Sequence, residues 1–247
     1  MQAPILILGA SSTLGGAIAR KLSKDGRQLI LHGFKGRNRL RELASECDGA
    51  QILTADLTNE NSVKVLFDEV SKIQDGLSGL IFSVAEKFAH KLTHRTQWSE
   101  FQAQFDSQLK AFHFCLTEAM PLLKSSESED SSRVIVLSTE YAIGIPPLKI
   151  TPYVVAKSAL TSYAKVIAQE WLKHNVRVHI LAPGMVKSNL TAEMPEMYLK
   201  EFTKMMPEKC LTSVMDVASV ASFLMTEAAD SLYGTVIPVT RGNRQSL

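Results

Sequence analysis

Short apolar runs alternate with amphipathic stretches along the whole chain. Most of the runs are too continuous for strands with one wet face and are typical of buried parallel strands; they are Ile5–Leu8, Leu29–Leu31, Gln51–Thr54, Leu80–Phe82, Val134–Leu137, Val176–Leu181 and Val236–Val239. Between them, apolar residues recur at the three- to four-residue spacing of helices, in Leu14–Lys24, Ser62–Ile73, Phe101–Leu123 and Ala156–Lys173. This alternation predicts an α/β fold, a doubly wound, Rossmann-like parallel sheet of about seven strands with flanking helices.

Two segments depart from this pattern within what we expect to be a single domain over residues 1–247. Residues 124–133 are polar, Ser-rich and acidic, which predicts a surface loop between a helix and a strand. Residues 185–210 contain Pro195, Pro207 and five methionines, which indicates short broken helices and an adaptable apolar surface. We expect the second segment to act as a lid over a substrate.

The overall composition excludes several classes of protein. The net charge of +2 gives no reason to expect a nucleic acid or an anionic membrane as partner, and no apolar run is long enough to span a membrane. The three cysteines form no C-x-x-C pair and the six histidines show no metal-ligand spacing, so we expect no metal site. Unpaired cysteines, together with the absence of a basic leader at the start, favour a reducing cytoplasm.

A glycine-rich turn follows the first expected strand directly. The stretch runs from Gly9 to Gly15 through Ala, Ser11, Ser12, Thr13 and Leu14, and the next helix begins near Leu14. Backbone N–H groups and a helix N-terminus therefore converge on one point, which is the geometry that binds the phosphates of a dinucleotide. The hydroxyl groups of this turn add hydrogen-bond donors. An ordinary strand-to-helix turn, capped by Ser11 or Ser12, is the alternative.

The end of the second expected strand carries basic residues. The acidic residue that holds a ribose 2′-hydroxyl in NAD-binding proteins is missing there, and Lys35 and Arg37 stand in its place. Both cations can neutralise a 2′-phosphate, so NADP(H) is favoured over NAD(H). A solvated helix start is the alternative, because Arg39 and Arg41 continue the basic run.

Tyr153 and Lys157 form a Y-x-x-x-K pair early in a helix, which puts a phenol and an ammonium on one face a turn apart. The same chain carries the glycine turn, Asp56-Leu57 after the third strand, Ser138-Thr139 after the fifth and Pro183-Gly184 after the sixth. In this order and spacing, the motifs resemble the short-chain dehydrogenase/reductase family across essentially the whole chain. The ketoreductases that act on 3-oxoacyl thioesters look most similar.

The resemblance implies catalytic roles for five residues. Tyr153 matches the tyrosine that exchanges a proton with the substrate oxygen, and Lys157 the lysine that lowers the pKa of that phenol and grips the nicotinamide ribose. Thr139 falls where the family has its catalytic serine, and Ser138 is the competing candidate; both hydroxyls could instead only cap the strand end. Gln108 falls at the asparagine that anchors a water in the proton relay, or is an exposed helical glutamine.

The resemblance also implies contacts with the cofactor after several strands. Asp56 matches a residue that bonds the adenine amine, with an Asp capping the following helix as the alternative. Ser188 matches the threonine that bonds the carboxamide, or caps a lid helix. The other expected contacts are Leu57 through its backbone, Ser83 and Ala85 in the stretch that replaces the family's N-N-A-G, Pro183 and Gly184 beneath the nicotinamide, and Val186. Glu86 stands where the family has a glycine.

The sequence therefore predicts an NADP(H)-dependent oxidoreductase that reduces a ketone, with a 3-oxoacyl thioester on acyl carrier protein or coenzyme A as the favoured substrate. Lys173, His174 and Arg177 are expected around the pocket mouth, where they would attract an acidic carrier protein, against repulsion from Glu127–Asp130. The ending Gly234–Gly242 resembles the contact surface of family tetramers, so a homodimer or homotetramer is expected.

Two alternatives stay open. A nucleotide-binding or regulatory subunit with weak or no turnover is supported by the departures at Thr13, Glu86, Gln108 and Thr139, all around one pocket. An epimerase or dehydratase on the same fold is a smaller possibility, since a fold alone does not fix the chemistry.

Overall fold

In the computed structural model, which describes residues 3–124, 131–188, 190–192 and 194–243, seven parallel strands form one sheet. Its order is β3-β2-β1-β4-β5-β6-β7, with strands β1 (Ile5–Leu8), β2 (Leu29–His32), β3 (Gln51–Leu53), β4 (Gly79–Phe82), β5 (Ser132–Leu137), β6 (Val176–Pro183) and β7 (Val236–Val239). The order reverses between β1 and β4, which creates the crevice where doubly wound sheets bind ligands. The expected fold class and strand positions are confirmed.

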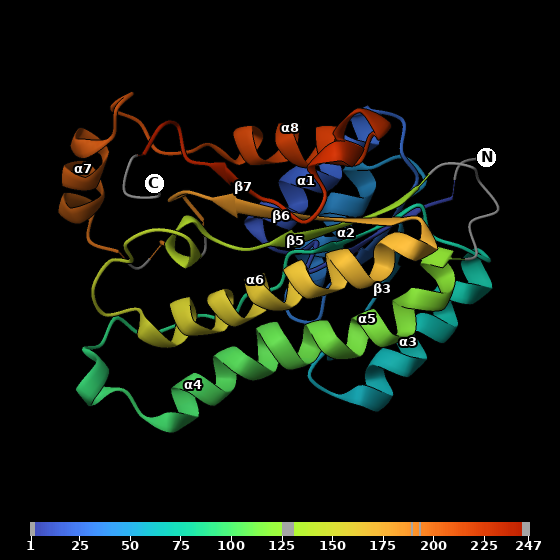
Figure 1. The fold of residues 1–247 in the computed structure, drawn as a ribbon, viewed down its shortest axis with the longest axis horizontal. Coiled ribbons are helices and arrows are strands. Elements are labelled where there is room, and N and C mark those ends of the chain that lie inside the picture. The colour runs from blue at the N-terminus through green and yellow to red at the C-terminus, as the bar shows by residue number, and fades with distance from the viewer. Residues whose placement is uncertain (1–2, 125–130, 189, 193, 244–247) are drawn as a thin grey trace.

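Helices cover both faces of the sheet (Figure 1). One face packs against α1 (Thr13–Lys24), α2 (Arg37–Glu46) and α8 (Val214–Leu224), and the other against α3 (Glu60–Ile73), α5 (Ala111–Lys124) and α6 (Thr151–Trp171). Side chains of β1 alternate between the two cores: Leu6 and Leu8 point into one, Ile5 and Ile7 into the other. Burial on both faces explains why the strands are continuously apolar.

The expected single helix over residues 101–123 is interrupted. It is divided into α4 (Trp98–Phe105), a π-helical turn over Asp106–Lys110, and α5. A π turn accommodates one extra residue in a helix and is often found at functional sites. Here it turns Ser107 and Gln108 into the interior, where both are buried.

The expected helix over residues 156–173 starts earlier than predicted, at Thr151, and has Pro152 in its first turn. Proline is favoured there because its missing N–H has no partner within a helix start. Tyr153 and Lys157 therefore lie in the first two turns of α6. Figure 1 shows that α6 runs from the end of the molecule nearest α7 (Glu196–Met205) toward the opposite end.

The 185–210 segment folds beyond the carboxyl ends of the strands and contains α7 (Figure 1). Phe202 of α7 packs with Met185 and Met206 in a small apolar cluster separate from the two main cores. A short parallel bridge between Val186 and Thr212 joins the two ends of the segment. The segment is thus anchored at its base while its helix packs on few residues.

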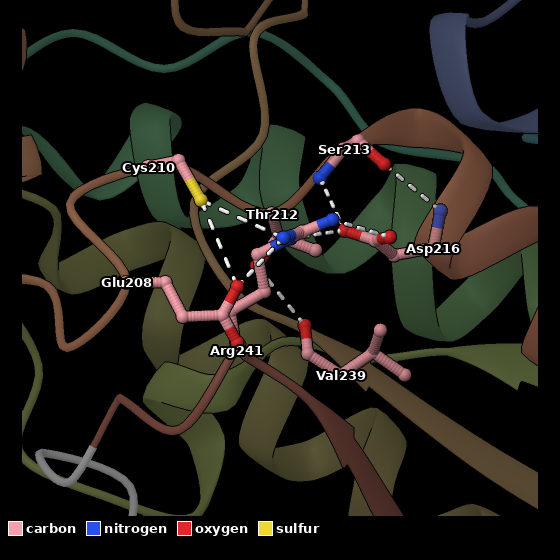
Figure 2. A network of polar contacts seen from close by, with 7 residues as sticks. All are labelled: Glu208, Cys210, Thr212, Ser213, Asp216, Val239 and Arg241. Atoms are coloured by element: carbon pink, nitrogen blue, oxygen red, sulfur yellow. Dashed lines mark hydrogen bonds and ion pairs between the residues drawn. The ribbon is translucent and has the colours of Figure 1, made fainter.

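Arg241, after β7, ties the far end of this segment to the body of the protein (Figure 2). Its Nε and Nη2 donate to the carboxylate of Asp216 in α8 at 2.6 and 2.8 Å, and its Nη1 donates to Glu208 at 2.8 Å. The Sγ atom of Cys210 lies 3.5 Å from Nη1. Ser213 and Asp216 also form a capping box at the start of α8, so Arg241 bonds to a well-defined helix end.

The polar stretch expected as a loop falls mostly outside the described residues, which exclude positions 125–130 and with them Glu127–Asp130. Its ends are ordered by the framework, since Lys124 closes α5 while Ser132 and Arg133 begin β5. The strand starts earlier than expected because Ser132 donates its N–H to the Asn175 carbonyl. No helix in the described part of the chain has the length and apolar character needed to cross a membrane.

Candidate active site

A cavity of about 570 Å³ opens at the carboxyl ends of β5 and β6. Segments far apart in the sequence line it, among them Leu14, Phe88, Thr139, Tyr153, Met185 and Met194. The carboxyl edge of the strands is where α/β sheets of this type bind ligands. The mostly apolar wall, with a few convergent polar groups, has the character of a small-molecule site.

Tyr153 lies on the wall of this cavity, and Lys157 lies one turn further along α6. Both are buried, with exposed fractions of 9% and 2%. Burial raises the pKa of the Tyr153 phenol to about 12; a hydrogen bond with Thr139 opposes this rise and the charge of Glu140 adds to it. The net direction is opposite to the lowering expected from Lys157, because burial outweighs the favourable contacts.

The ammonium group of Lys157 is strongly desolvated. Its Nζ donates a 2.6 Å hydrogen bond to the carbonyl of Leu137 at the end of β5. Burial lowers the pKa of this group to about 7 from an ordinary value of 10.5. Burial therefore disfavours the charged form of Lys157.

The two hydroxyls after β5 face different neighbours. Ser138 Oγ shares a hydrogen bond with Thr161 Oγ1, which in turn donates to the Lys157 carbonyl at 2.7 Å. Thr139 is extended, with φ −156°; its hydroxyl caps the following turn by accepting from the Tyr141 N–H at 3.5 Å, and it also interacts with the Tyr153 phenol. The geometry thus favours Thr139 as the hydroxyl beside the reacting group, while Ser138 is engaged with α6.

Phe88 lies against the ring of Tyr153 with a centroid separation of 4.6 Å and an interplanar angle of 29°. The ring belongs to the loop after β4 and forms one wall of the cavity. No sequence signal pointed to it, because a single phenylalanine in an irregular loop has no distinguishing pattern.

Gln108 is completely buried on the π turn, so the alternative of an exposed helical glutamine is wrong. Its Nε2 donates to Oε1 of Gln104 at 2.6 Å. The π turn packs against α6, the helix that carries Tyr153.

The turn from Gly9 to Gly15 needs glycine at both ends. Gly9 has φ +83°, and a Cβ atom there would lie 2.7 Å from the Ser83 carbonyl oxygen; at Gly15 it would lie 2.4 Å from the Gly9 carbonyl oxygen. Ser12 Oγ accepts from the Gly15 N–H at 3.0 Å and caps α1, as the capping alternative proposed. The cap leaves the phosphate interpretation intact, because Thr13 and Leu14 still open a helix whose positive end faces the turn.

Ser83 packs directly on this turn, with its Oγ 3.3 Å from Ser12 Oγ, whereas Ala85 is exposed. The hydroxyl of Ser11 donates to the Lys35 carbonyl at 3.2 Å, which brings the basic residues beside the turn. These contacts, together with the space required at the two glycines, fit a dinucleotide laid across the carboxyl edge of β1 and β2.

The expected 2′-phosphate residues are exposed and adjoin an acid. Arg37 is the first residue of α2, whose first turn contains no acidic residue. The Nζ atom of Lys35 lies 3.7 Å from Oε2 of Glu86, the residue that replaces the family's glycine. Arg39 Nη1 also donates to the Ser11 carbonyl at 3.4 Å. Glu86 is thus placed to compete with a phosphate for Lys35.

His32, to which the sequence assigned no role, is hydrogen-bonded to the backbone of the glycine turn. Its Nδ1 accepts from the Gly9 N–H at 3.3 Å, so its Nε2 carries the proton and donates to the Ala55 carbonyl at 3.1 Å. Burial lowers the pKa of this imidazole to about 4, so it is neutral at physiological pH. Its place as the last residue of β2, beside the glycine turn, was the only available signal.

Asp56 does not cap the next helix, as one alternative proposed, because Asn59 does so by accepting from the Ser62 N–H. Instead Asp56 Oδ1 accepts from the N–H and the hydroxyl of Thr58 at 2.9 and 2.7 Å. The neighbouring Leu57 is buried. Asp56 is therefore held in a tight turn after the carboxyl end of β3.

The turn after β6 approaches two other segments closely. Pro183 ends the strand, and a Cβ atom at Gly184 would lie 2.8 Å from Thr212 Oγ1. Val186 and Ser188 line the cavity just beyond. Ser188 Oγ accepts from the Leu190 N–H at 3.2 Å and so caps a local turn, since α7 begins only at Glu196.

Lys173, His174 and Arg177 do not surround the pocket mouth, which corrects the expectation from the sequence. Lys173 and His174 follow the end of α6, and Arg177 is near the start of β6. These ends lie at the side of the molecule opposite α7 and the cavity (Figure 1). A parallel strand carries its two ends to opposite edges of the sheet, and β6 is eight residues long.

No group of histidine, cysteine, aspartate or glutamate residues within the described ranges is arranged to hold a metal ion. The candidate site therefore consists of hydroxyl, phenol, ammonium and amide groups around an apolar cavity.

Known proteins resemble this chain over its full length. The family model described as enoyl-(acyl carrier protein) reductase matches residues 9–243. The chain is 26% identical to the 3-oxoacyl-(acyl-carrier-protein) reductase FabG of Rickettsia bellii, over 96% of this chain and 95% of that protein. It is 28% identical to nodulation protein G of Rhizobium meliloti, with coverages of 96% and 95%.

Two solved structures share the fold. The Pseudomonas aeruginosa RhlG/NADP active-site complex superposes with a TM-score of 0.91 at 21% identity, covering 100% of this chain and 98% of that one. The 3-ketoacyl-(acyl-carrier-protein) reductase of Brucella melitensis complexed with NADH gives a TM-score of 0.90 at 19% identity, with coverages of 100% and 99%. Because the family model spans nearly the whole chain and curated relatives align along it, the chain belongs to the short-chain dehydrogenase/reductase family of oxidoreductases.

Proposed function

We propose that this protein is an NADP(H)-dependent ketoreductase whose substrate is a 3-oxoacyl thioester. The observation that carries the proposal is the Tyr153 phenol next to the Thr139 hydroxyl on the wall of an apolar cavity, with the buried Lys157 ammonium one turn further along α6. The glycine turn opens on the same edge of the sheet.

The chemistry needs a proton donor at the substrate oxygen. A bound nicotinamide supplies the hydride that reduces the carbonyl carbon. Tyr153, with a pKa near 12, stays protonated at neutral pH and donates its proton to the carbonyl oxygen as negative charge develops there. Thr139 donates a hydrogen bond at the same place, and Lys157, with a pKa near 7, returns a proton to the phenol.

The preference for NADP(H) follows from charge. Arg37 stands at the positive end of the α2 dipole with no acid in the first turn, an arrangement that is unfavourable until an anion binds. Lys35 adds a second exposed cation nearby. A 2′-phosphate would offset the repulsion at Arg37 and compete with Glu86 for Lys35, whereas the 2′-hydroxyl of NAD(H) would do neither.

The cavity supports an acyl substrate. Its wall includes Leu14, Phe88, Met185 and Met194, which suit a hydrocarbon chain next to a reacting carbonyl. Curated relatives named 3-oxoacyl-(acyl-carrier-protein) reductase support the same class. We propose that the 185–210 segment is the lid over this cavity, and that the acyl group is carried as a pantetheine thioester on acyl carrier protein or coenzyme A. We also propose that the protein is a homodimer or homotetramer, which sedimentation velocity would test.

The test is a panel assay that follows NADPH absorbance with 3-oxoacyl thioesters on carrier protein, coenzyme A and a pantetheine mimic, and with simple ketones. Reduction of the thioesters supports the proposal. Reduction of simple ketones alone contradicts the substrate class. NADPH binding without any turnover would instead favour a nucleotide-binding subunit.

A further inference from the structure

Two glutamine side chains form a buried chain of amides between α4, the π turn and the loop after β4. Gln104 and Gln108 have exposed fractions of 2% and 0%. Gln104 Nε2 donates to the carbonyls of Glu86 and Lys87 at 3.3 and 3.0 Å, and its Oε1 accepts from Gln108 Nε2 at 2.6 Å. The sequence analysis singled out Gln108 but gave no role to Gln104.

The two backbone carbonyls fix the orientation of both amides. A carbonyl oxygen can only accept, so the nitrogen of Gln104 must face Glu86 and Lys87 and its oxygen must face Gln108. The nitrogen of Gln108 must then point back to Gln104. Its oxygen is consequently directed away from Gln104 and has no hydrogen-bond partner among the described residues.

A buried acceptor without a donor costs about 1–3 kcal/mol, and such groups are rare unless they have a use. The π turn that carries this oxygen packs against α6, which presents Tyr153 and Lys157. The same nitrogen of Gln104 holds the backbone just before Phe88, whose ring stacks on Tyr153. Gln104 thus connects the π turn, which packs on α6, with the loop whose Phe88 stacks on the reacting phenol.

We propose that Gln104 is a positioning residue for the reaction: it sets the amide of Gln108 so that an acceptor, not a donor, faces the catalytic interior, and it holds the loop that places Phe88 on Tyr153. The proposal rests on the proposed ketoreductase function. Gln104 acts through these neighbours and does not touch the substrate.

Two substitutions separate the tasks of this side chain. Gln104→Met keeps the length but removes the acceptor for Gln108 and the donor for the two carbonyls, so the Gln108 amide is free to flip. Gln104→Glu keeps an oxygen that accepts from Gln108, but a carboxylate has no N–H to donate, so the bonds to the Glu86 and Lys87 carbonyls are lost. Gln102→Met is the matched control, because Gln102 lies on the same helix but is exposed and bonds Asp106 at 3.0 Å.

The experiment measures kcat, KM, the pH dependence of kcat, NADPH affinity and melting temperature for these variants and for Gln108→Met. We expect Gln104→Met to lower kcat by roughly 10-fold or more and to leave NADPH affinity unchanged. The expected loss is smaller than the full contribution of a proton relay, because Gln104 acts only through its neighbours. Gln104→Glu should keep the orientation of the Gln108 amide but release the loop before Phe88, so its kcat should fall less than that of Gln104→Met, and Gln102→Met should match wild type. Combining Gln104→Met with Gln108→Met should add little further loss, because both act through one group.

Wild-type kcat and pH dependence in Gln104→Met, or a loss that simply adds to that of Gln108→Met, would overturn the proposal. A loss confined to melting temperature would also overturn it, since that is what a purely structural role produces. A wild-type enzyme that reduces no carbonyl contradicts the proposed function itself, whereas an active wild type that tolerates Gln104→Met contradicts this inference alone.

Discussion

Replacing Lys157 should separate catalysis from stability. The ammonium is buried, and its pKa is about 7 in the folded protein against an ordinary 10.5. Between these two values the unfolded chain binds a proton that the folded chain does not. Stability therefore rises with pH across this window, and the group destabilises the fold most strongly below pH 7. Lys157→Met removes the titration and also abolishes turnover.

The size of the effect follows from the shift. The contribution of Lys157 to the free energy of unfolding changes by about 1.4 kcal/mol per pH unit inside the window, and this slope flattens near pH 7. Between pH 7 and pH 9, the free energy of unfolding of wild type should therefore rise by about 2 kcal/mol relative to that of Lys157→Met. At pH 7 the desolvated ammonium destabilises wild type by about 4 kcal/mol. Lys157→Met removes this cost but also loses the hydrogen bond to the Leu137 carbonyl, which is worth about 1–3 kcal/mol. The variant should therefore be the more stable protein at pH 7, by about 1–3 kcal/mol.

Urea unfolding followed by circular dichroism at several pH values and one protein concentration measures both quantities. Lys165→Met is the matched control, because Lys165 lies on the same helix but is exposed. Its stability should follow wild type at every pH. Parallel curves for wild type and Lys157→Met across pH 7 to 9 would refute the reasoning.

The remaining predictions concern cofactor choice and the substrate hydroxyl. Fluorescence titration should show that wild type binds NADPH more tightly than NADH, and that Lys35→Glu/Arg37→Glu reverses this order. Equal affinities of wild type for the two cofactors would contradict the proposed NADP(H) preference. Thr139→Ala should lower kcat by about 100-fold, as loss of an oxyanion-type donor does, while Thr139→Ser is tolerated. A larger loss from Ser138→Ala in the same assay would mean that the other hydroxyl serves the substrate.

The sheet was predictable because strands buried on both faces are continuously apolar, and the helices between them are long enough to show their period. The π turn was not, since the extra residue leaves the apolar spacing of residues 101–123 nearly unchanged. Burial of Gln108 follows from that turn, so the sequence alone left Gln108 open between a relay residue and an exposed helical glutamine.

The misplaced basic residues have a different cause. Lys173, His174 and Arg177 were assigned to the pocket mouth by charge alone, but the direction of α6 and β6 carries them to the opposite edge of the sheet. Contacts such as Phe88 with Tyr153 or His32 with Gly9 join segments far apart in the sequence. Local patterns do not encode such pairs, and only the packed structure brings them together.

The most direct test of the central claim compares wild type with Tyr153→Phe in NADPH-dependent reduction of a 3-oxoacyl thioester. We predict turnover by wild type and none by the variant, with NADPH affinity nearly unchanged, because the phenol transfers a proton and contributes little to holding the phosphates. Reduction by Tyr153→Phe at the wild-type rate, or no reduction of any carbonyl by wild type, would contradict it.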